Sequence, residues 1–210
     1  MRLCGIAGKS GAGKTEYAKH AIGIFGGTKV ALGDAVKEEV GAFITSCGLT
    51  YEPRHLWGSQ ADRAELLSMN VAQWMLSDYR PRAVLSKYTT WDTPTRISIS
   101  YRQLLQTWGT EYRRAQSGSY WCDKGRDKAR SIDGLVFIDD IRFPDEAQMI
   151  KDEGGILVRI ERPGGPRIKE CGHASEVSLD AYTGFDVTII NAGDLTDLHE
   201  TAEAILRLVI

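Results

Sequence analysis

The sequence predicts an α/β fold: a three-layer sandwich with a mostly parallel five-stranded sheet and helices on both faces. Three observations predict it. The chain opens with an apolar segment, residues 2–7, that runs through a glycine-rich stretch into a helical pattern. Strand-like and helix-like segments then alternate to the end of the chain, which is typical of parallel sheets. A further apolar segment, residues 134–140, ends in two aspartates.

Length and composition are those of an ordinary globular domain. The 210 residues are 42% hydrophobic and 26% charged, which fits one domain of 1–210 with inserted segments. The 26 basic and 28 acidic residues nearly balance, so the overall charge does not favour binding to a membrane or to polymeric nucleic acid. We expect a reduced, cytoplasmic protein, because the four cysteines form no C-x-x-C pair and no signal peptide is visible.

The glycine-rich stretch after the first strand fits the pattern G-x-x-x-x-G-K-[ST] (Walker A). In this pattern backbone N–H groups surround a phosphate chain, and the following helix adds the partial positive charge of its N-terminus. The lysine reaches the β- and γ-phosphates, and the hydroxyl binds Mg²⁺. The sequence therefore predicts a nucleoside-triphosphate site, as opposed to a chance turn, at Gly8, Lys9, Ser10, Gly11, Ala12, Gly13, Lys14 and Thr15.

The apolar strand at residues 134–140 has the form of a Walker B strand. Its two terminal carboxylates, Asp139 and Asp140, would lie at the carboxyl edge of the sheet beside the phosphate loop. An acid in this place orients Mg²⁺ or its waters. Asp is also a common helix cap, so the interpretation depends on the phosphate loop upstream. We take both as candidate metal residues and Asp140 as a candidate catalytic residue.

The remaining elements follow from hydrophobic periodicity and capping signals. Ser100 with Gln103 forms a capping box at the start of a helix that Gly109–Glu111 interrupts. A middle segment, about 48–98, is expected to be an inserted substrate-binding lobe. We predict helices at 14–24, 34–47, 61–79, 100–108, 120–130 and 195–208, strands at 28–32, 155–161 and 186–191, and a hairpin of 82–88 with 96–98 around a turn at 91–94.

A basic run lies in the predicted helix 120–130 and includes Lys124, Arg126, Lys128 and Arg130. A run of this kind is either a solvated face or a mobile lid over bound phosphates. We assign the lid to a segment at about 113–132. Asp34 and Lys37 lie three residues apart, so both project from the first turn of their helix, where they either bind a ligand or serve as a routine cap.

Several motifs, in this order and spacing, resemble the phage-type deoxynucleoside monophosphate kinases, within the nucleoside monophosphate kinase-like group of P-loop proteins. The segment 48–98 matches nothing in that family. A weaker match covers residues 32–38. The motifs are Gly8–Thr15, Arg102–Glu111 followed by Tyr120 and Trp121, Asp140–Arg142 with Glu146, Arg162–Gly164, His173 with Glu176, and Ile190–Leu195.

The resemblance implies transfer of the ATP γ-phosphoryl to the 5′-phosphate of a deoxynucleoside monophosphate, for DNA precursor synthesis. ATP and Mg²⁺ are the implied cofactors, with Lys14 and the loop on ATP and with Thr15 and Asp140 or Asp139 on the metal. The implied partners are small-molecule nucleotides. We expect the protein in the cytoplasm, that of the host if a phage encodes it, and leave a homodimer open.

The resemblance also implies roles for single residues. Arg102 and Arg142 would grip the acceptor phosphate or the transferring group, since a guanidinium binds phosphate oxygens at two points. The alternative is a structural ion pair with Glu111 or Asp140. Further implied roles are base reading by Gln106, acceptor positioning by Asp34, Lys37, Glu111 and Trp121 (the last better suited to packing), closure over ATP by Arg126 and Arg130, and contact with adenine by Arg162, Pro163 and Gly164.

Two other classes of function remain open. One is a P-loop kinase for another acceptor, such as dephospho-coenzyme A or a modified base in DNA. The near-neutral charge argues against DNA as the acceptor. The other is a nucleotide-dependent switch without catalysis, but the N-K-x-D strand end that reads guanine is absent from the sequence.

Overall fold

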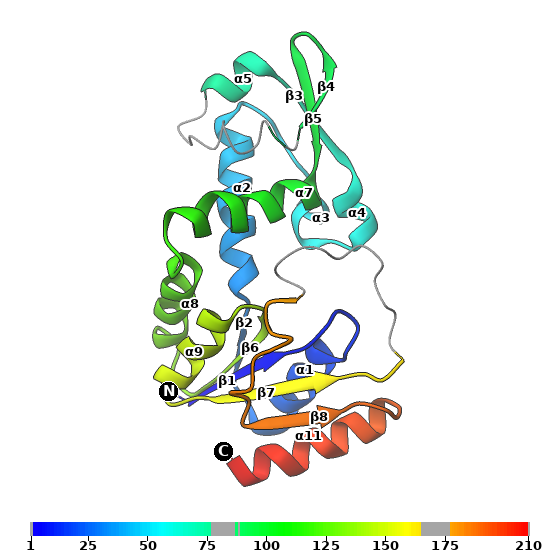
Figure 1. Ribbon diagram of the computed structural model, residues 1–210, viewed down its shortest axis with the longest axis vertical. Coiled ribbons are helices and arrows are strands. Elements are labelled where there is room, and N and C mark those ends of the chain that lie inside the picture. The colour runs from blue at the N-terminus through cyan, green and yellow to red at the C-terminus, as the bar shows by residue number, and fades with distance from the viewer. Residues whose placement is uncertain (1, 77–86, 88, 165–176, 210) are drawn as a thin grey trace. The chain divides into compact units, whose positions relative to one another are not determined.

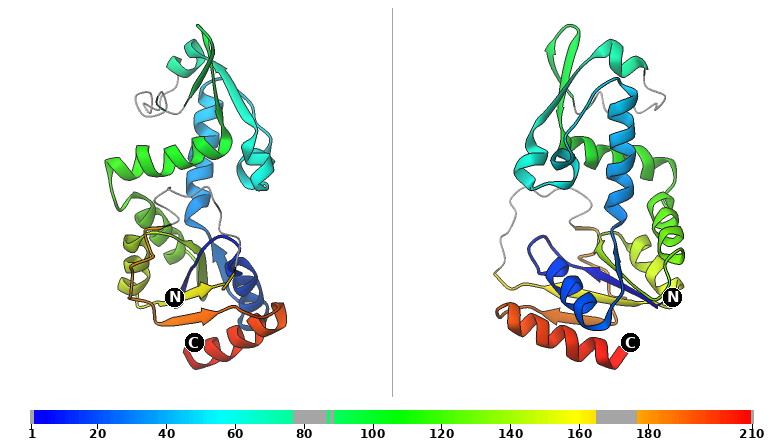
Figure 2. Two further views of the ribbon diagram at one scale, coloured as in Figure 1. Left: turned by 45° about the vertical axis from the view of Figure 1, so that its right-hand side comes forward. Right: turned by 180° about the vertical axis from the view of Figure 1, so that it is seen from behind.

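The computed structural model describes residues 2–76, 87, 89–164 and 177–209. The chain divides into two compact units. The core unit consists of Met1–Leu32 and Trp121–Ile210, and the inserted unit of Gly33–Tyr120. Figures 1 and 2 show the elements of both.

The core unit contains a five-stranded sheet in the order β2-β6-β1-β7-β8. All neighbouring strands pair in parallel, which confirms the predicted parallel α/β sheet. Because β1 is central, the loop that follows it lies near the middle of the carboxyl edge. The strands are β1 (Arg2–Ala7), β2 (Thr28–Val30), β6 (Leu135–Ile141), β7 (Ile156–Glu161) and β8 (Val187–Ile190).

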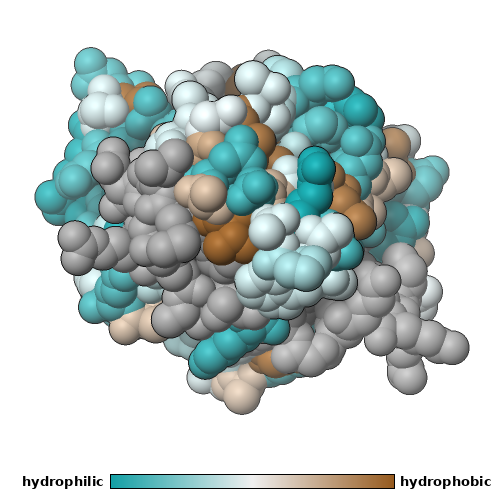
Figure 3. All heavy atoms as spheres, turned by 90° about the horizontal axis from the view of Figure 1, so that it is seen from above, coloured by the Kyte–Doolittle hydropathy of each residue, from teal (hydrophilic) through white to brown (hydrophobic). Residues whose placement is uncertain are grey.

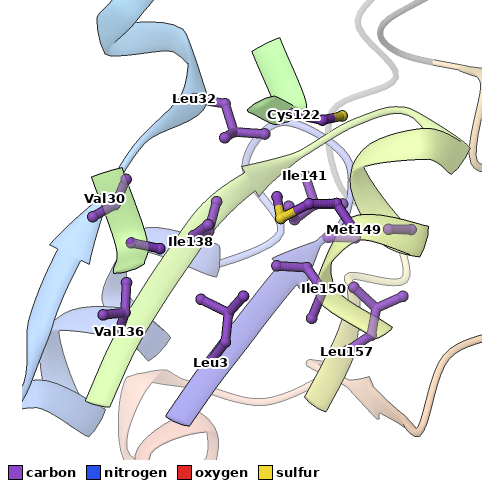
Figure 4. Packing of buried hydrophobic residues seen from close by; sticks show 13 residues of the cluster. Leu3, Val30, Leu32, Cys122, Val136, Ile138, Ile141, Met149, Ile150 and Leu157 are labelled. Atoms are coloured by element: carbon purple, nitrogen blue, oxygen red, sulfur yellow. The ribbon is translucent and has the colours of Figure 1, made fainter. Parts of the chain in front are cut away.

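Helices cover both faces of this sheet, because successive strand side chains are apolar on both sides. The first face packs against α1 (Lys14–Phe25) and α11 (Leu195–Val209), which lie together in Figure 2. The second face packs against α8 (Tyr120–Arg130) and α9 (Pro144–Asp152). Figure 4 shows the second cluster, in which Leu3, Ile138 and Leu157 from three adjacent strands meet Met149 and Ile150 of α9.

The inserted unit combines helices with a small antiparallel sheet in the order β3-β5-β4. Its last helix changes from α-helical to π-helical at Thr107. The elements are α2 (Leu32–Ser46, whose first residue belongs to the core unit), α3 (Pro53–Trp57), α4 (Gln60–Ala64), β3 (Leu66–Asn70), α5 (Val71–Leu76), β4 (Thr90–Thr93), β5 (Arg96–Ser100), α7 (Tyr101–Gln106) and the π-helix η1 (Thr107–Arg114).

Two predictions for the inserted unit are wrong. The expected helix 61–79 is broken by β3, where Leu67 and Met69 are buried and pair with Ile99 and Ile97 of β5. Pairing with a distant strand thus overrides the helical spacing of these residues. The second predicted hairpin strand is β5, but its partner is β4, which includes Trp91 of the predicted turn. The predicted first strand falls on 82–88, of which only residue 87 is described.

Figure 3 shows one face of the molecule, where hydrophilic residues cover most of the coloured surface and apolar side chains form small separate areas. Of the helices in the described part of the chain, none has the length and apolar character needed to cross a membrane. Cys4, Cys47 and Cys122 are buried, and Cys171 lies outside the described residues.

Candidate functional site

At two positions of the loop between β1 and α1, the backbone has a conformation that favours glycine. Gly8 has a φ of 148°, and a Cβ there would lie 2.3 Å from the carbonyl oxygen of Ile160. Gly13 has a φ of 105° and is the N-cap of α1. Lys14 is the first residue of that helix, and its Nζ donates to the carbonyl oxygens of Gly8, at 2.7 Å, and Lys9, at 2.8 Å. The ammonium therefore lies across the loop.

The structure separates the two aspartates at the end of β6. Thr15 Oγ1 donates to Asp139 Oδ2 at 3.0 Å, so this carboxylate adjoins the phosphate loop. Asp140 Oδ1 instead accepts a hydrogen bond from the backbone N–H of Leu32 at 2.9 Å. Successive side chains of a strand point to opposite faces, so the two carboxylates cannot both face α1. The geometry favours Asp139 over Asp140 beside Thr15.

A residue that the sequence analysis missed also contacts Asp139. Lys29 Nζ of β2 lies 2.9 Å from Asp139 Oδ2, the same oxygen that accepts from Thr15. Asp139 is only 5% exposed, and a buried carboxylate needs such a partner. The contact between Lys29 and Asp139 could not be predicted from the sequence, because the contact depends on the register between β2 and β6.

Other predicted residues lie at the same carboxyl edge of the sheet. Arg142 directly follows β6, and its backbone N–H donates to Glu146 Oε2 at 2.7 Å. Glu146 is buried and also accepts from Phe143 N, so it fixes the backbone where β6 passes into α9. Arg162–Gly164 are exposed and directly follow β7. Parallel strands end at one edge, and ligands of open α/β sheets bind there.

Asn191, at the end of β8, is a second residue whose role was missed. Its Nδ2 donates to the carbonyl oxygen of Ala12 at 2.9 Å, and its backbone N–H donates to Glu161 O at 2.7 Å. A Cβ on Gly13 would lie 2.9 Å from this Nδ2. Asn191 therefore ties the phosphate loop to the ends of β7 and β8. Its place in the motif Ile190–Leu195 was the available signal.

The predicted lid arginines do not lie at this edge. Arg130 Nη2 and Nε bond the two carboxylate oxygens of Glu153 at 2.7 and 3.1 Å, and Arg126 Nε lies 3.3 Å from the same carboxylate. α8 precedes β6 and packs against the sheet, so its C-terminus lies where β6 begins, opposite the phosphate loop. Both arginines are therefore paired with Glu153 away from the phosphate loop, and their assignment to a lid over ATP stays a prediction.

Four of the predicted acceptor residues lie on two helices of the inserted unit, α2 and α7. In the first turn of α2, Lys37 Nζ donates to Asp34 Oδ1 at 2.7 Å, as their spacing predicts. Arg102 and Gln106 are half-buried and four residues apart on α7. Ser100 Oγ accepts from Gln103 N at 3.1 Å, which confirms the predicted N-cap. Two further motif residues, His173 and Glu176, lie outside the described residues.

Glu39 of α2 binds three donors, two from η1 and one from the start of α8. Its Oε2 accepts from Trp108 Nε1 at 3.0 Å and from Arg113 Nε at 2.7 Å, and its Oε1 accepts from the Tyr120 hydroxyl. Burial raises the pKa of Glu39, but these hydrogen bonds outweigh it and hold the pKa below its ordinary value. Burial and the bond to Glu39 raise the pKa of Tyr120 to about 12.

The π-helix explains how Trp108 and Arg113 reach one carboxylate oxygen. Residues five apart in an α-helix of 3.6 residues per turn are rotated by about 140° from one another. In a π-helix the hydrogen bonds run from i to i+5, which brings such residues to one side. The same stretch carries Glu111, a predicted acceptor residue. Trp121 is 4% exposed, which agrees with packing rather than with stacking on a base.

No family model matches the chain. A curated protein of Acanthamoeba polyphaga mimivirus, named "Putative deoxynucleotide monophosphate kinase", is 25% identical over 205 residues, which cover 95% of this chain and 93% of that protein. The unliganded crystal structure of a sugar kinase from Janibacter sp. HTCC2649 is similar with a TM-score of 0.41 and 15% identity, covering 100% of this chain and 96% of that one. The similarity to the mimivirus protein over nearly the whole chain confirms the resemblance to deoxynucleoside monophosphate kinases that the motifs indicated.

Proposed function

We propose that this chain is a phosphotransferase that moves the γ-phosphoryl group of ATP to the 5′-phosphate of a deoxynucleoside monophosphate. The observation that carries the proposal is the phosphate loop after β1, with Lys14 across it and Thr15 bonded to Asp139. The mimivirus relative, named for this class of kinase, supports it. Small nucleotides are the proposed partners.

The phosphate loop would hold the donor. Phosphoryl transfer asks the protein mainly to position two anions in line and to stabilise charge. The loop, the N-terminus of α1 and Lys14 offer positive charge and backbone donors for the β- and γ-phosphates. To bind there, the Lys14 ammonium has to exchange the carbonyls of Gly8 and Lys9 for phosphate oxygens.

The donor atoms near Thr15 fit Mg²⁺. This ion is usually bound by one or two carboxylates together with substrate phosphates and water. Thr15 and Asp139 supply a hydroxyl and a buried carboxylate 3.0 Å apart. Among the described residues no group of three His, Cys, Asp or Glu side chains could hold a metal alone. Phosphate oxygens and water would complete the set of ligands. When bound, Mg²⁺ would neutralise charge on the transferring group.

The acceptor would bind through the arginines of the matched motifs. Arg102 and Arg142 are the proposed phosphate ligands, with Gln106 on the base and with Asp34 and Lys37 positioning the nucleotide. No general base is required, because the acceptor phosphate is already an anion. We assign the choice of base to residues of the inserted unit within 48–98, which the family motifs do not cover.

A coupled ADP-release assay tests the proposal. The four common deoxynucleoside monophosphates, their ribose counterparts, dephospho-coenzyme A and duplex DNA are each supplied with Mg·ATP. We expect at least one deoxynucleoside monophosphate to raise ADP release about tenfold or more over ATP alone, and Lys14→Ala to abolish that increase. Stimulation only by dephospho-coenzyme A or by DNA would replace the proposed acceptor. If none of these compounds raised ADP release, the result would contradict a kinase that acts on any of them.

A further inference from the structure

We propose that Lys29 is a placeholder for the divalent cation: its ammonium neutralises Asp139 in the free protein and gives up the carboxylate when the metal binds. The proposal rests on the proposed function only for the identity of the metal site. The proposal adds Lys29, a residue of the edge strand β2, to the site. It also means that lysine and metal compete for one carboxylate oxygen of Asp139.

The contact geometry places lysine and hydroxyl on the same atom. Asp139 Oδ2 lies 2.9 Å from Lys29 Nζ and 3.0 Å from Thr15 Oγ1. Thr15 and Asp139 are the residues that would adjoin Mg²⁺. A divalent cation that binds Asp139 Oδ2 needs the lone pairs that Lys29 and Thr15 now use, so lysine and metal exclude one another at this oxygen.

The register of the sheet makes this contact a consequence of the fold. Lys29 of β2 is the direct partner of Phe137 of β6, and Asp139 lies two residues further along β6. Partners in register, and residues two apart on a strand, share one face of the sheet. Phe137 packs in the cluster formed with α1 and α11, and Val30 packs in the cluster on the other face. Lys29 is therefore directed to the face of the phosphate loop.

Asp139 and Lys29 differ in solvent exposure, and this difference favours the exchange of Lys29 for a metal ion at Asp139. Asp139 is 5% exposed and is fixed on the inner strand β6, whereas Lys29 is 40% exposed and carries its charge on a flexible side chain. A buried carboxylate without a cation is unfavourable, so Asp139 needs Lys29 until another cation arrives. Lys29 can return its ammonium to water at small cost, as partly exposed ion pairs do. Lys14 is directed to the carbonyls of the loop.

The experiment measures Mn²⁺ binding to the free protein by electron paramagnetic resonance, without nucleotide. Lys29→Met keeps the length of the side chain and removes its charge. We expect it to bind Mn²⁺ about tenfold or more tightly than the unmodified protein, because a competing positive charge has left the site. Lys19→Met is the matched control, since Lys19 is exposed on α1 and pairs with Glu16. Lys29→Arg, which keeps the charge, should show no gain.

Three outcomes would overturn the proposal: equal or weaker Mn²⁺ binding by Lys29→Met, an equal gain in Lys19→Met, or a gain that persists when Asp139→Asn is added to Lys29→Met. A second measurement needs no variant and covers the case in which Lys29→Met does not fold. Reductive methylation of Lys29 in the unmodified protein should become faster as Mg²⁺ is added, relative to Lys19, and an unchanged ratio would contradict the release of Lys29. Neither readout depends on phosphoryl transfer, so a negative kinase assay and a failure of this proposal are distinguishable.

Discussion

The core unit and the inserted unit each contain a largely buried carboxylate with several partners, and the two carboxylates are bound in opposite ways. In the core unit, one oxygen of Asp139 is shared by a hydroxyl and by a lysine that is 40% exposed. In the inserted unit, both oxygens of Glu39 are used by three donors, and its partner Arg113 is itself largely enclosed by Trp108, Tyr112 and Tyr120.

The difference separates a group that exchanges partners from a group that fixes a helix. Asp139 can release Lys29 to solvent and accept a metal ion. Two of the donors to Glu39 are not readily released to solvent, since Trp108 is buried and Arg113 stacks among three aromatic rings. Changes in the core unit should therefore alter transfer and metal use, and changes around Glu39 should alter stability and acceptor binding.

The largest effect is expected for Lys14→Ala. Removing the ammonium that lies across the phosphate loop should lower kcat by about a hundredfold or more, as loss of other preorganised electrostatic groups does. Steady-state kinetics with saturating ATP and acceptor measure it, and Lys19→Ala, on the exposed side of α1, is the control. A kcat for Lys14→Ala near that of the unmodified enzyme would remove Lys14 from the mechanism.

The next effect compares Asp139→Asn with Asp140→Asn. Asn at 139 loses the charge beside Thr15, so we expect a fall in kcat of about tenfold to a hundredfold and a higher Mg²⁺ requirement. Asn at 140 keeps an oxygen that can accept from Leu32 N, so its loss of kcat should be at least tenfold smaller. The measurement is kcat as a function of Mg²⁺ concentration. The reverse order would return the metal role to Asp140.

Glu39→Gln should change the inserted unit without altering the phosphate loop. Loss of charge-assisted hydrogen bonds to Trp108 and Arg113 should cost about 1.5–3 kcal/mol of unfolding free energy. If Glu39 fixes the helix that carries Arg102, Gln106 and Glu111, the KM for the acceptor should rise and the KM for ATP should not. Glu38→Gln, at an exposed neighbouring position, is the control. Equal changes in both KM values would contradict this division.

The stabilising effect of Glu39 should depend on pH. Its folded-state pKa is below the ordinary value of 4.5, so the carboxylate stabilises the fold fully above that value. The stabilisation is lost as the pH falls below 4.5 through the lower folded-state pKa. Urea unfolding of the unmodified protein and of Glu39→Gln should therefore give free energies that differ at pH 7 and converge in acid. A constant difference would show that the charge of Glu39 is not the cause.

The smallest effect is expected for Arg126→Ala combined with Arg130→Ala. Both guanidiniums pair with Glu153 at the edge opposite the phosphate loop, so the KM for ATP should stay within about twofold and the melting temperature should fall slightly. Kinetics and thermal melting measure the two quantities. A tenfold rise in the KM for ATP would support the lid assignment.

The parallel sheet and the phosphate loop could be predicted because each follows from local pattern. The inner strands β1, β6 and β7 are apolar runs buried on both faces. The loop is a short motif in which a Cβ on Gly8 would meet the backbone of Ile160 and one on Gly13 the side chain of Asn191. Capping at Ser100 and the Asp34–Lys37 pair are equally local.

The features that could not be predicted depend on register or on distant partners. Asp139 and Asp140 are adjacent in the sequence. Which of them contacts Thr15 depends on which residues of β6 point to the face of the sheet that packs against α1. Lys29 becomes part of the site through its pairing opposite Phe137. The strand β3 forms where helical spacing was expected, because Leu67 and Met69 pair with β5. The π-helix is marked in the sequence only by the interruption at Gly109.

The most direct test of the proposed activity is transfer of labelled phosphate from [γ-³²P]ATP, with the products separated by chromatography. A deoxynucleoside monophosphate kinase should place the label in the diphosphate of at least one deoxynucleoside, in a reaction that needs Mg²⁺ and is lost in Lys14→Ala. Label that stays in ATP, or that appears only as inorganic phosphate with every deoxynucleoside monophosphate tested, would contradict the proposed activity.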